Sequence, residues 1–165
     1  MSNNYLKNIF RKRKNNLQLH EPSFDIKELN ILKKCIGNNE VSTAGKFTLE
    51  LENIIKKKLN CKNVVATNSG TSALHLALLA LGVKKEDEVL MPSLNYIASA
   101  NACLYIGAIP HFIDIETKTL GIDVKKLDTY LKNTTQIRKN KYCINKKTKR
   151  KIKAIICLHT FGHPC

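Results

Sequence analysis

Several features that mark membrane, metal-binding or secreted proteins are missing from this sequence. Its six cysteines include no C-x-x-C pair, so the closely spaced ligands of a structural zinc site are lacking. No apolar run approaches the roughly 20 residues of a membrane span. No apolar segment follows the basic N-terminal residues, as a secretory signal requires. We therefore expect a cytoplasmic chain with reduced thiols, no metal site and no membrane partner, and with Cys103 and Cys157 in the core.

Acidic residues are also scarce, with 13 Asp and Glu against 28 Lys and Arg. The imbalance comes from two segments without any acid: residues 1–20 hold five basic residues, and residues 132–153 hold ten. The remaining chain has as many basic as acidic residues. A nucleic-acid-binding domain usually spreads its basic residues over a folded face. We therefore interpret the first segment as a basic arm and the second as a solvated basic insertion, with polyanion binding as the alternative and nucleic acid an unexpected partner.

From residue 21 onward the hydrophobic pattern predicts a single α/β domain. The whole chain of 165 residues is long enough for one hydrophobic core. Apolar residues at helical spacing predict a helix near 24–37 and another beginning after Ser42 or Thr43. Short apolar runs then alternate with helical stretches, which favours a mostly parallel sheet flanked by helices. The predicted strands are 64–67, 88–91, 111–115 and 154–158, with helices at 71–81, 98–105 and after the capping residue Asp123. A weak hairpin pairs 142–144 with 150–152.

The segment after the first predicted strand has the composition of an anion site. It reads Asn-Ser-Gly-Thr-Ser over residues 68–72 and opens an apolar helix. The first turn of a helix has unpaired N–H groups and the positive end of the helix dipole, so Gly70 and Thr71 could hold a phosphate without a lysine. A well-capped helix start explains the same residues equally well. Tyr96, in the loop after the next strand, either stacks on a flat ligand or packs at a helix start.

Three segments carry a resemblance to a known family: N-S-G-T-S-A-L-H-L-A-L-L-A-L-G-V (68–83), D-E-V-L-M-P-S-L-N-Y-I-A-S-A-N-A (87–102) and G-A-I-P-H-F-I-D-I (107–115). They resemble the sugar aminotransferases typified by the DegT/DnrJ/EryC1/StrS proteins. Residues 19–22, 41–47 and 145–148 are similar to a narrower branch, which aminates nucleotide-linked 4-keto-6-deoxy sugars on the way to legionaminic acid-type surface sugars.

This resemblance implies the large domain of a fold type I enzyme that uses pyridoxal phosphate and works as a homodimer. It implies that Gly70, Thr71 and Ser72 hold the cofactor phosphate and that Tyr96 stacks on the pyridine ring. Ser42, Thr43 and Gly45 would lie near the substrate entrance. His159 and His163 match the family pattern as structural or pocket-lining residues. The substrates would be a nucleotide sugar and an amino-acid donor, with glutamate expected.

No residue of the chain matches the family's catalytic positions. The resemblance places the Schiff-base lysine and the acid that pairs with the pyridinium nitrogen after the His-x-Phe-Gly-His-Pro segment, beyond Cys165. We therefore expect an N-terminal part of an aminotransferase that is inactive alone. The alternatives are a sugar dehydratase of the same family, in which a histidine replaces the lysine, a non-catalytic phosphate- or polyanion-binding fragment, and an inert fragment.

Overall fold

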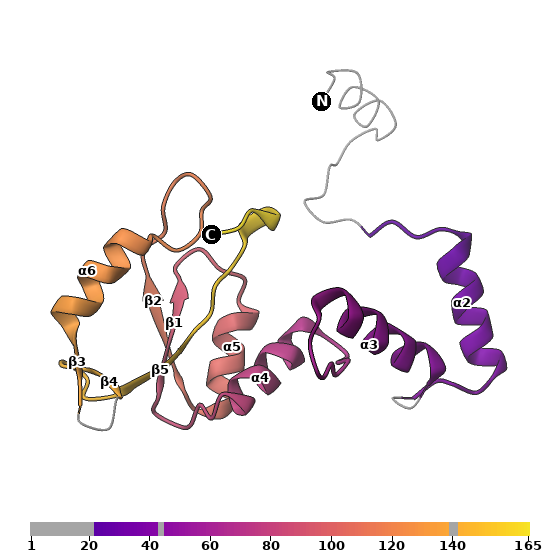
Figure 1. Ribbon diagram of the computed structural model, residues 1–165, viewed down its shortest axis with the longest axis horizontal. Helices are drawn as coiled ribbons and strands as arrows, with labels where there is room; N and C mark the ends of the chain where they lie inside the picture. The colour runs from indigo at the N-terminus through magenta and orange to yellow at the C-terminus, as the bar shows by residue number, and fades with distance from the viewer. Residues whose placement is uncertain (1–21, 43–44, 139–141) are drawn as a thin grey trace, which may run out of the picture. The chain divides into compact units, whose positions relative to one another are not determined.

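The computed structural model describes residues 22–42, 45–138 and 142–165 (Figure 1). These residues divide between two compact units, of which the first ends at Val64 and the second begins at Val65. The first unit contains helices α2 (Ile26–Gly37) and α3 (Lys46–Leu59). The second contains the sheet and the remaining helices. The basic arm expected over residues 1–20 lies outside the described residues. None of the described helices is long and apolar enough to cross a membrane.

The two helices of the first unit begin in different ways. Asp25 caps α2 through a capping box, in which its side chain accepts from the Lys27 N–H and Glu28 accepts from the Asp25 N–H. Helix α3 has Gly45 as its N-cap residue and no side-chain cap, so the prediction of a cap at Ser42 or Thr43 is wrong for the described Ser42. The Lys46 N–H instead donates to Glu40 Oε2 at 3.2 Å, so a carboxylate six residues away takes the role of the cap.

The second unit is built on a five-stranded sheet in the order β2-β1-β5-β4-β3. Strand β1 pairs in parallel with β2 and β5, whereas β4 pairs antiparallel with β3 and β5. The α/β class is therefore confirmed, and the sheet is mixed because a hairpin extends its parallel part. The strands are β1 (Glu88–Pro92), β2 (Ile109–Ile113), β3 (Thr135–Ile137), β4 (Cys143–Asn145) and β5 (Lys151–Ile155).

Helices cover both faces of β1, which explains why this strand is apolar without alternation (Figure 1). Helices α4 (Gly70–Ala80) and α5 (Ala98–Ile106) pack on the face that carries Val89 and Met91, with Leu78 and Cys103 in the same cluster. Helix α6 (Val124–Thr134) covers the other face, where Leu90 lies in a second cluster. Burial raises the pKa of Cys103 to about 11. Cys157, also expected in the core, is exposed because it follows the end of β5.

Three predicted strands differ from the observed ones. Residues 64–67 form no strand in the described structure, because none of the five strands of the sheet pairs with them. Strand β2 begins two residues earlier than predicted and β5 three residues earlier. The predicted hairpin is confirmed by the pairs Cys143↔Ile152 and Ile144↔Lys151. Residues 132–153, expected as a basic insertion, thus supply β3, β4 and the start of β5.

Candidate functional site

The loop before α4 is held in shape by its own side chains. Thr67 Oγ1 donates to the Ser69 carbonyl at 3.0 Å, and Ser69 Oγ caps the helix by accepting from the Ser72 N–H at 3.2 Å. Ser72 Oγ donates in turn to Asn68 Oδ1 at 2.7 Å. Both polar groups of Ser72 are therefore engaged within the loop, which fixes the direction in which the helix starts.

Three polar groups in this first turn have no partner among the described residues. No described residue accepts a hydrogen bond from the N–H of Gly70 or Thr71, or pairs with the Thr71 hydroxyl. A Cβ at Gly70 would have no atom within 4 Å, and the φ of Gly70 is not in the left-handed region. Neither packing nor backbone strain therefore requires glycine here. The open space and the free donors at the positive end of α4 fit an anion that approaches the backbone.

The loop after β1 presents an aromatic ring and an unsatisfied amide. The Ser93 N–H donates to the Ile113 carbonyl at 2.9 Å and anchors the loop to β2. The ring of Tyr96 follows, with 76% of the residue exposed. The side-chain oxygen and nitrogen of Asn95 are both buried and have no partner among the described residues. A buried polar group without a partner costs about 1–3 kcal/mol, so this amide favours a missing hydrogen-bonding partner at the loop.

The two loops lie at the same end of the second unit. Helix α4 leads into β1 and α5 leads into β2, so each helix runs opposite to the strand that follows it. The helices pack side by side, with the His75 and Tyr105 rings 5.7 Å apart. Gly70, Thr71, Ser72 and Tyr96 are therefore brought to the end at which β1 finishes, the usual ligand end of an open α/β sheet.

The expected substrate residues lie in the other unit. Ser42 is exposed and lies just before the undescribed residues 43 and 44. Gly45 is buried and is the N-cap residue of α3. Thr43 lies outside the described residues. The positions of the two units relative to each other are not defined, so these residues remain a prediction from the resemblance.

The segment after β5 is held by one local contact at His159 and by one contact to the distant residue Leu120. Its Nδ1 accepts from the Cys165 N–H at 3.2 Å, and Thr160 Oγ1 donates to the Leu120 carbonyl at 3.2 Å. His159 and His163 are both exposed. Among the described residues, no group of three or more His, Cys, Asp or Glu side chains is arranged to hold a metal ion.

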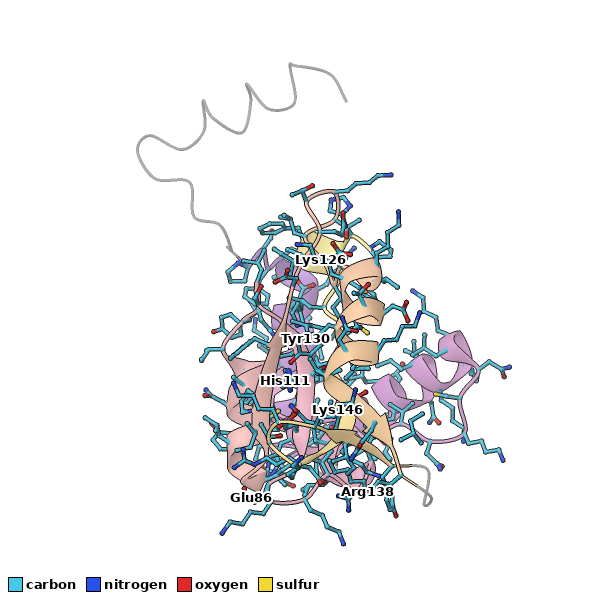
Figure 2. The ribbon with its side chains drawn as sticks, turned by 90° about the vertical axis from the view of Figure 1, so that its left-hand side faces the viewer. Glu86, His111, Lys126, Tyr130, Arg138 and Lys146 are labelled. Atoms are coloured by element: carbon cyan, nitrogen blue, oxygen red, sulfur yellow. The ribbon has the colours of Figure 1, made fainter. Side chains whose placement is uncertain are left out.

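An open groove of about 620 Å³ lies elsewhere, between β2 and α6. Phe112 contributes to its walls, together with Lys126 and Tyr130, which are labelled in Figure 2. None of the residues predicted to bind cofactor or substrate lines it. The groove is therefore distinct from the predicted cofactor and substrate residues.

A buried carboxylate at the start of β1 is the main feature that the sequence did not reveal. Glu88 is 2% exposed, and its Oε2 lies 2.7 Å from His111 Nδ1 and 3.0 Å from Asn145 Nδ2. The Thr148 hydroxyl donates to its Oε1, and His111 Nε2 lies 2.8 Å from the Tyr130 hydroxyl (Figure 2). Burial opposes ionisation of Glu88, but the hydrogen bonds outweigh it and hold its pKa below the ordinary value.

This network joins β1, β2, α6 and the β4–β5 turn at the end of the sheet away from the Gly70 loop. We therefore regard it as structural. The only sequence signal for it was the segment N-K-K-T (145–148), whose first and last residues turn out to contact Glu88.

Comparison with known proteins identifies the family. Residues 22–165 match the sequence profile of the DegT/DnrJ/EryC1/StrS aminotransferase family. The chain belongs to this family. It is 34% identical over 149 residues to the GDP-perosamine synthase of Escherichia coli O157:H7, covering 90% of this chain and 36% of the relative. The GDP-perosamine synthase of Caulobacter vibrioides is 35% identical over 144 residues, with 87% and 34% covered. The chain thus spans about a third of the length of these curated relatives.

Solved structures of aminotransferases share the fold. The aminotransferase from Psychrobacter cryohalolentis superposes with a TM-score of 0.69 at 28% identity, covering 87% of this chain and 32% of that one. A sugar aminotransferase from Streptococcus pneumoniae, solved in its PMP form, gives a TM-score of 0.69 at 26% identity, with 92% and 34% covered. The described α/β unit is thus part of a fold type I domain.

Proposed function

We propose that the protein containing this chain is a pyridoxal-phosphate-dependent aminotransferase. It transfers an amino group from an amino-acid donor, with glutamate expected, to a nucleotide-linked 4-keto-6-deoxy sugar for surface glycan synthesis in the cytoplasm. The observation that carries the proposal is the open first turn of α4, with free donors at Gly70 and Thr71 and space where a side chain would be. The family match supports the reaction class.

The residues present fit the cofactor. When bound, pyridoxal phosphate supplies the electron sink that allows an amino group to be exchanged with a keto group. The Gly70 and Thr71 amides and the Thr71 hydroxyl donate to its phosphate, while Ser72, already bonded to Asn68, keeps the turn in shape. The exposed ring of Tyr96 covers the pyridine ring.

The substrate proposal rests on the relatives. Two curated relatives are GDP-perosamine synthases, which supports a nucleotide-linked sugar as the amino acceptor. Ser42, Thr43 and Gly45 are proposed to lie at its entrance. The protein is proposed to act as a homodimer, which light scattering of the purified protein checks.

The 165 residues alone are expected to give no transaminase turnover, because the resemblance places the Schiff-base lysine after His163. Reduction with borohydride in the presence of pyridoxal phosphate should leave no site-specific adduct. A stoichiometric adduct on one lysine, together with turnover, would contradict this expectation.

Cofactor titration of variants tests the phosphate site in the protein that contains this chain. A hydrogen bond to a charged group contributes about 1.5–3 kcal/mol, so Thr71→Ala should weaken binding roughly ten- to a hundredfold. Gly70→Val should weaken it further, because its branched side chain fills the open space. Tyr96→Ala should have the smallest effect, since an aromatic contact adds only about 0.5–1.5 kcal/mol beyond its buried area.

Thr129→Ala is the matched control, since it removes an exposed hydroxyl on α6 that donates only to the Lys125 carbonyl. Each variant is first shown to be folded by circular dichroism. If Thr71→Ala and Gly70→Val bind the cofactor as the control does, residues 68–72 are only a helix cap.

A further inference from the structure

The end of the sheet that is away from the Gly70 loop carries a concentration of unneutralised lysines. They come from the turn before β1 and from the β4–β5 hairpin with the strand that follows it. We call this surface the basic edge and define it by Lys84, Lys85, Lys147, Lys149 and Lys153. No described acid forms an ion pair with any of the five.

Strand pairing brings these two segments together. Strands β1 and β5 are parallel neighbours, so both begin at the same end of the sheet. Arg150 bridges the segments, with its Nε and Nη2 each 3.1 Å from Glu86 Oε2. Lys153 lies beside Gly82, within 3.8 Å of the position of a Cβ there. Figure 2 shows Glu86 at this end of the molecule, with Lys126 at the opposite end.

The hairpin turn holds its lysines outward in a fixed arrangement. Asn145 Oδ1 accepts from the Lys147 N–H at 2.9 Å, and the Thr148 hydroxyl points inward to Glu88. Lys147 and Lys149 are left exposed on the outside. Lys149 also has a φ of 62°, a conformation in which glycine or asparagine is less strained. The lysine at this position places a positive charge on the turn although the left-handed backbone conformation is strained for a residue with a side chain.

The acids near the basic edge offset only part of its charge. Glu86 is bound to Arg150, and Asp87, whose Oδ2 accepts from the Lys84 N–H at 2.9 Å, leaves one carboxylate against the five lysines. On α6, in contrast, Lys126 pairs with Asp114 and Lys132 with Asp128. Mutual repulsion of uncompensated lysines opposes folding, so the edge is not explained by stability.

We propose that the basic edge docks the protein on the surface of an anionic lipid bilayer. Lysines on adjoining turns at one end of a sheet meet a plane of lipid phosphates together, and each contributes a point charge. Leu81, 57% exposed, directly precedes Gly82 and adds an apolar contact. Arg150, the arginine between the two segments, is bound to Glu86, and the ring of Tyr142 in the hairpin is contacted by Lys151 Nζ at 3.5 Å from its centroid. Both groups are therefore engaged within the protein rather than free to contact bases, so single- or double-stranded nucleic acid fits less well. Docking here leaves the Gly70 loop accessible.

Vesicle co-sedimentation of the 165-residue chain tests the proposal. The chain should bind phosphatidylcholine vesicles that contain about 30% phosphatidylglycerol at about 0.1 M salt and should dissociate from them at about 1 M salt. It should not bind vesicles of pure phosphatidylcholine. The variant Lys84→Gln, Lys147→Gln, Lys149→Asn removes three charges, with asparagine chosen to tolerate the left-handed backbone. At about fivefold for each lysine, its partition coefficient should fall about a hundredfold.

The control removes three charges elsewhere, through Lys56→Gln, Lys57→Gln and Lys58→Gln in the last turn of α3. The partition coefficient of this control should stay at least about tenfold higher than that of the edge variant, because the docking lysines remain in place. Equal losses in both variants, absence of vesicle binding, or tighter binding to a single-stranded oligonucleotide at the same phosphate concentration would overturn the proposal. Circular dichroism confirms that both variants are folded.

Discussion

Replacing Glu88 by alanine should destabilise the second unit more than any surface substitution. Glu88 begins β1 and is 2% exposed. Its carboxylate accepts from Asn145 and Thr148 in the β4–β5 turn and contacts His111 in β2. The substitution therefore removes the acceptor that joins the parallel strands to the hairpin, and it leaves several donors without their partner.

The loss in the free energy of unfolding depends on whether each donor that loses its acceptor can instead bond to water. Asn145 is 4% exposed, so its amide stays buried and unsatisfied, which costs about 1–3 kcal/mol. The lost bond from Thr148 to a charged acceptor adds about 1.5–3 kcal/mol. The His111 side chain is 13% exposed and keeps its contact with Tyr130, so we assign it no further loss. The two contributions sum to about 2.5–6 kcal/mol, a range that includes the effect of breaking a buried ion pair.

Urea denaturation followed by circular dichroism measures this loss at neutral pH. The matched control is Glu86→Ala, two residues earlier in the chain, whose side chain is 58% exposed and pairs with Arg150. A surface ion pair of this kind contributes less than about 1 kcal/mol. If Glu88→Ala lowers the free energy of unfolding by no more than Glu86→Ala, the carboxylate does not hold the hairpin and the reasoning is refuted.

The same site predicts a pH dependence. Hydrogen bonds from Thr148, Asn145 and His111 overcome burial and hold the pKa of Glu88 below the ordinary value of 4.5. Stability from this group is therefore complete above pH 4.5 and is lost as the pH falls from there through the lower folded-state pKa. Glu88→Gln should lose less stability over that acidic window than the parent. Parallel pH profiles of the two proteins would contradict this.

Two further substitutions test local features of the fold, each by urea denaturation. Asp123→Ala removes the side chain that accepts from the Lys126 N–H at the start of α6 and should cost about 1 kcal/mol, so an unchanged midpoint would exclude a working cap. Gly107→Ala should destabilise by about 1 kcal/mol or more, because φ is +76° and Lys85 Cγ lies 3.1 Å from the new Cβ. Gly70→Ala, with open space and no positive φ, should not destabilise, and equal losses would refute this distinction.

The elements that were predicted correctly are those with signals inside a short stretch of chain. Helix α4 begins within one residue of its prediction, because Ser69 and the apolar residues after it define the start locally. Asp123 caps α6 as expected. Strand β1 was identified because it is apolar at successive positions, which reflects burial on both faces.

Features that depend on distant partners were missed. Strand β3 is short and exists because Thr135–Ile137 pairs with β4. The start of β5 is shifted because one continuous strand serves both the hairpin and the parallel sheet. The burial of Glu88 could not be predicted from its neighbours in the sequence, because its partners Asn145 and Thr148 lie 57 and 60 residues away. No local pattern contains that information.

The candidate site was predictable to the extent that anion binding is a local property of a helix start. Free N–H groups at Gly70 and Thr71 require only the turn that these residues form, whereas the buried amide of Asn95 depends on packing and went unnoticed. The two ends of the sheet consequently differ in kind. At the Gly70 end, no described residue accepts from the N–H groups of Gly70 and Thr71, whereas the Glu88 end uses a buried acceptor to hold strands together.

This division separates the effects of substitution. Thr71→Ala should change cofactor affinity while leaving the unfolding midpoint unchanged, because the Thr71 hydroxyl has no described partner to lose. Glu88→Gln should lower stability while leaving cofactor affinity in the folded protein unchanged, because its carboxylate contacts only the opposite end of the sheet. Both quantities are measured on each variant. If either substitution altered both to a similar degree, the two ends would be coupled, and the structural role assigned to the Glu88 network would be wrong.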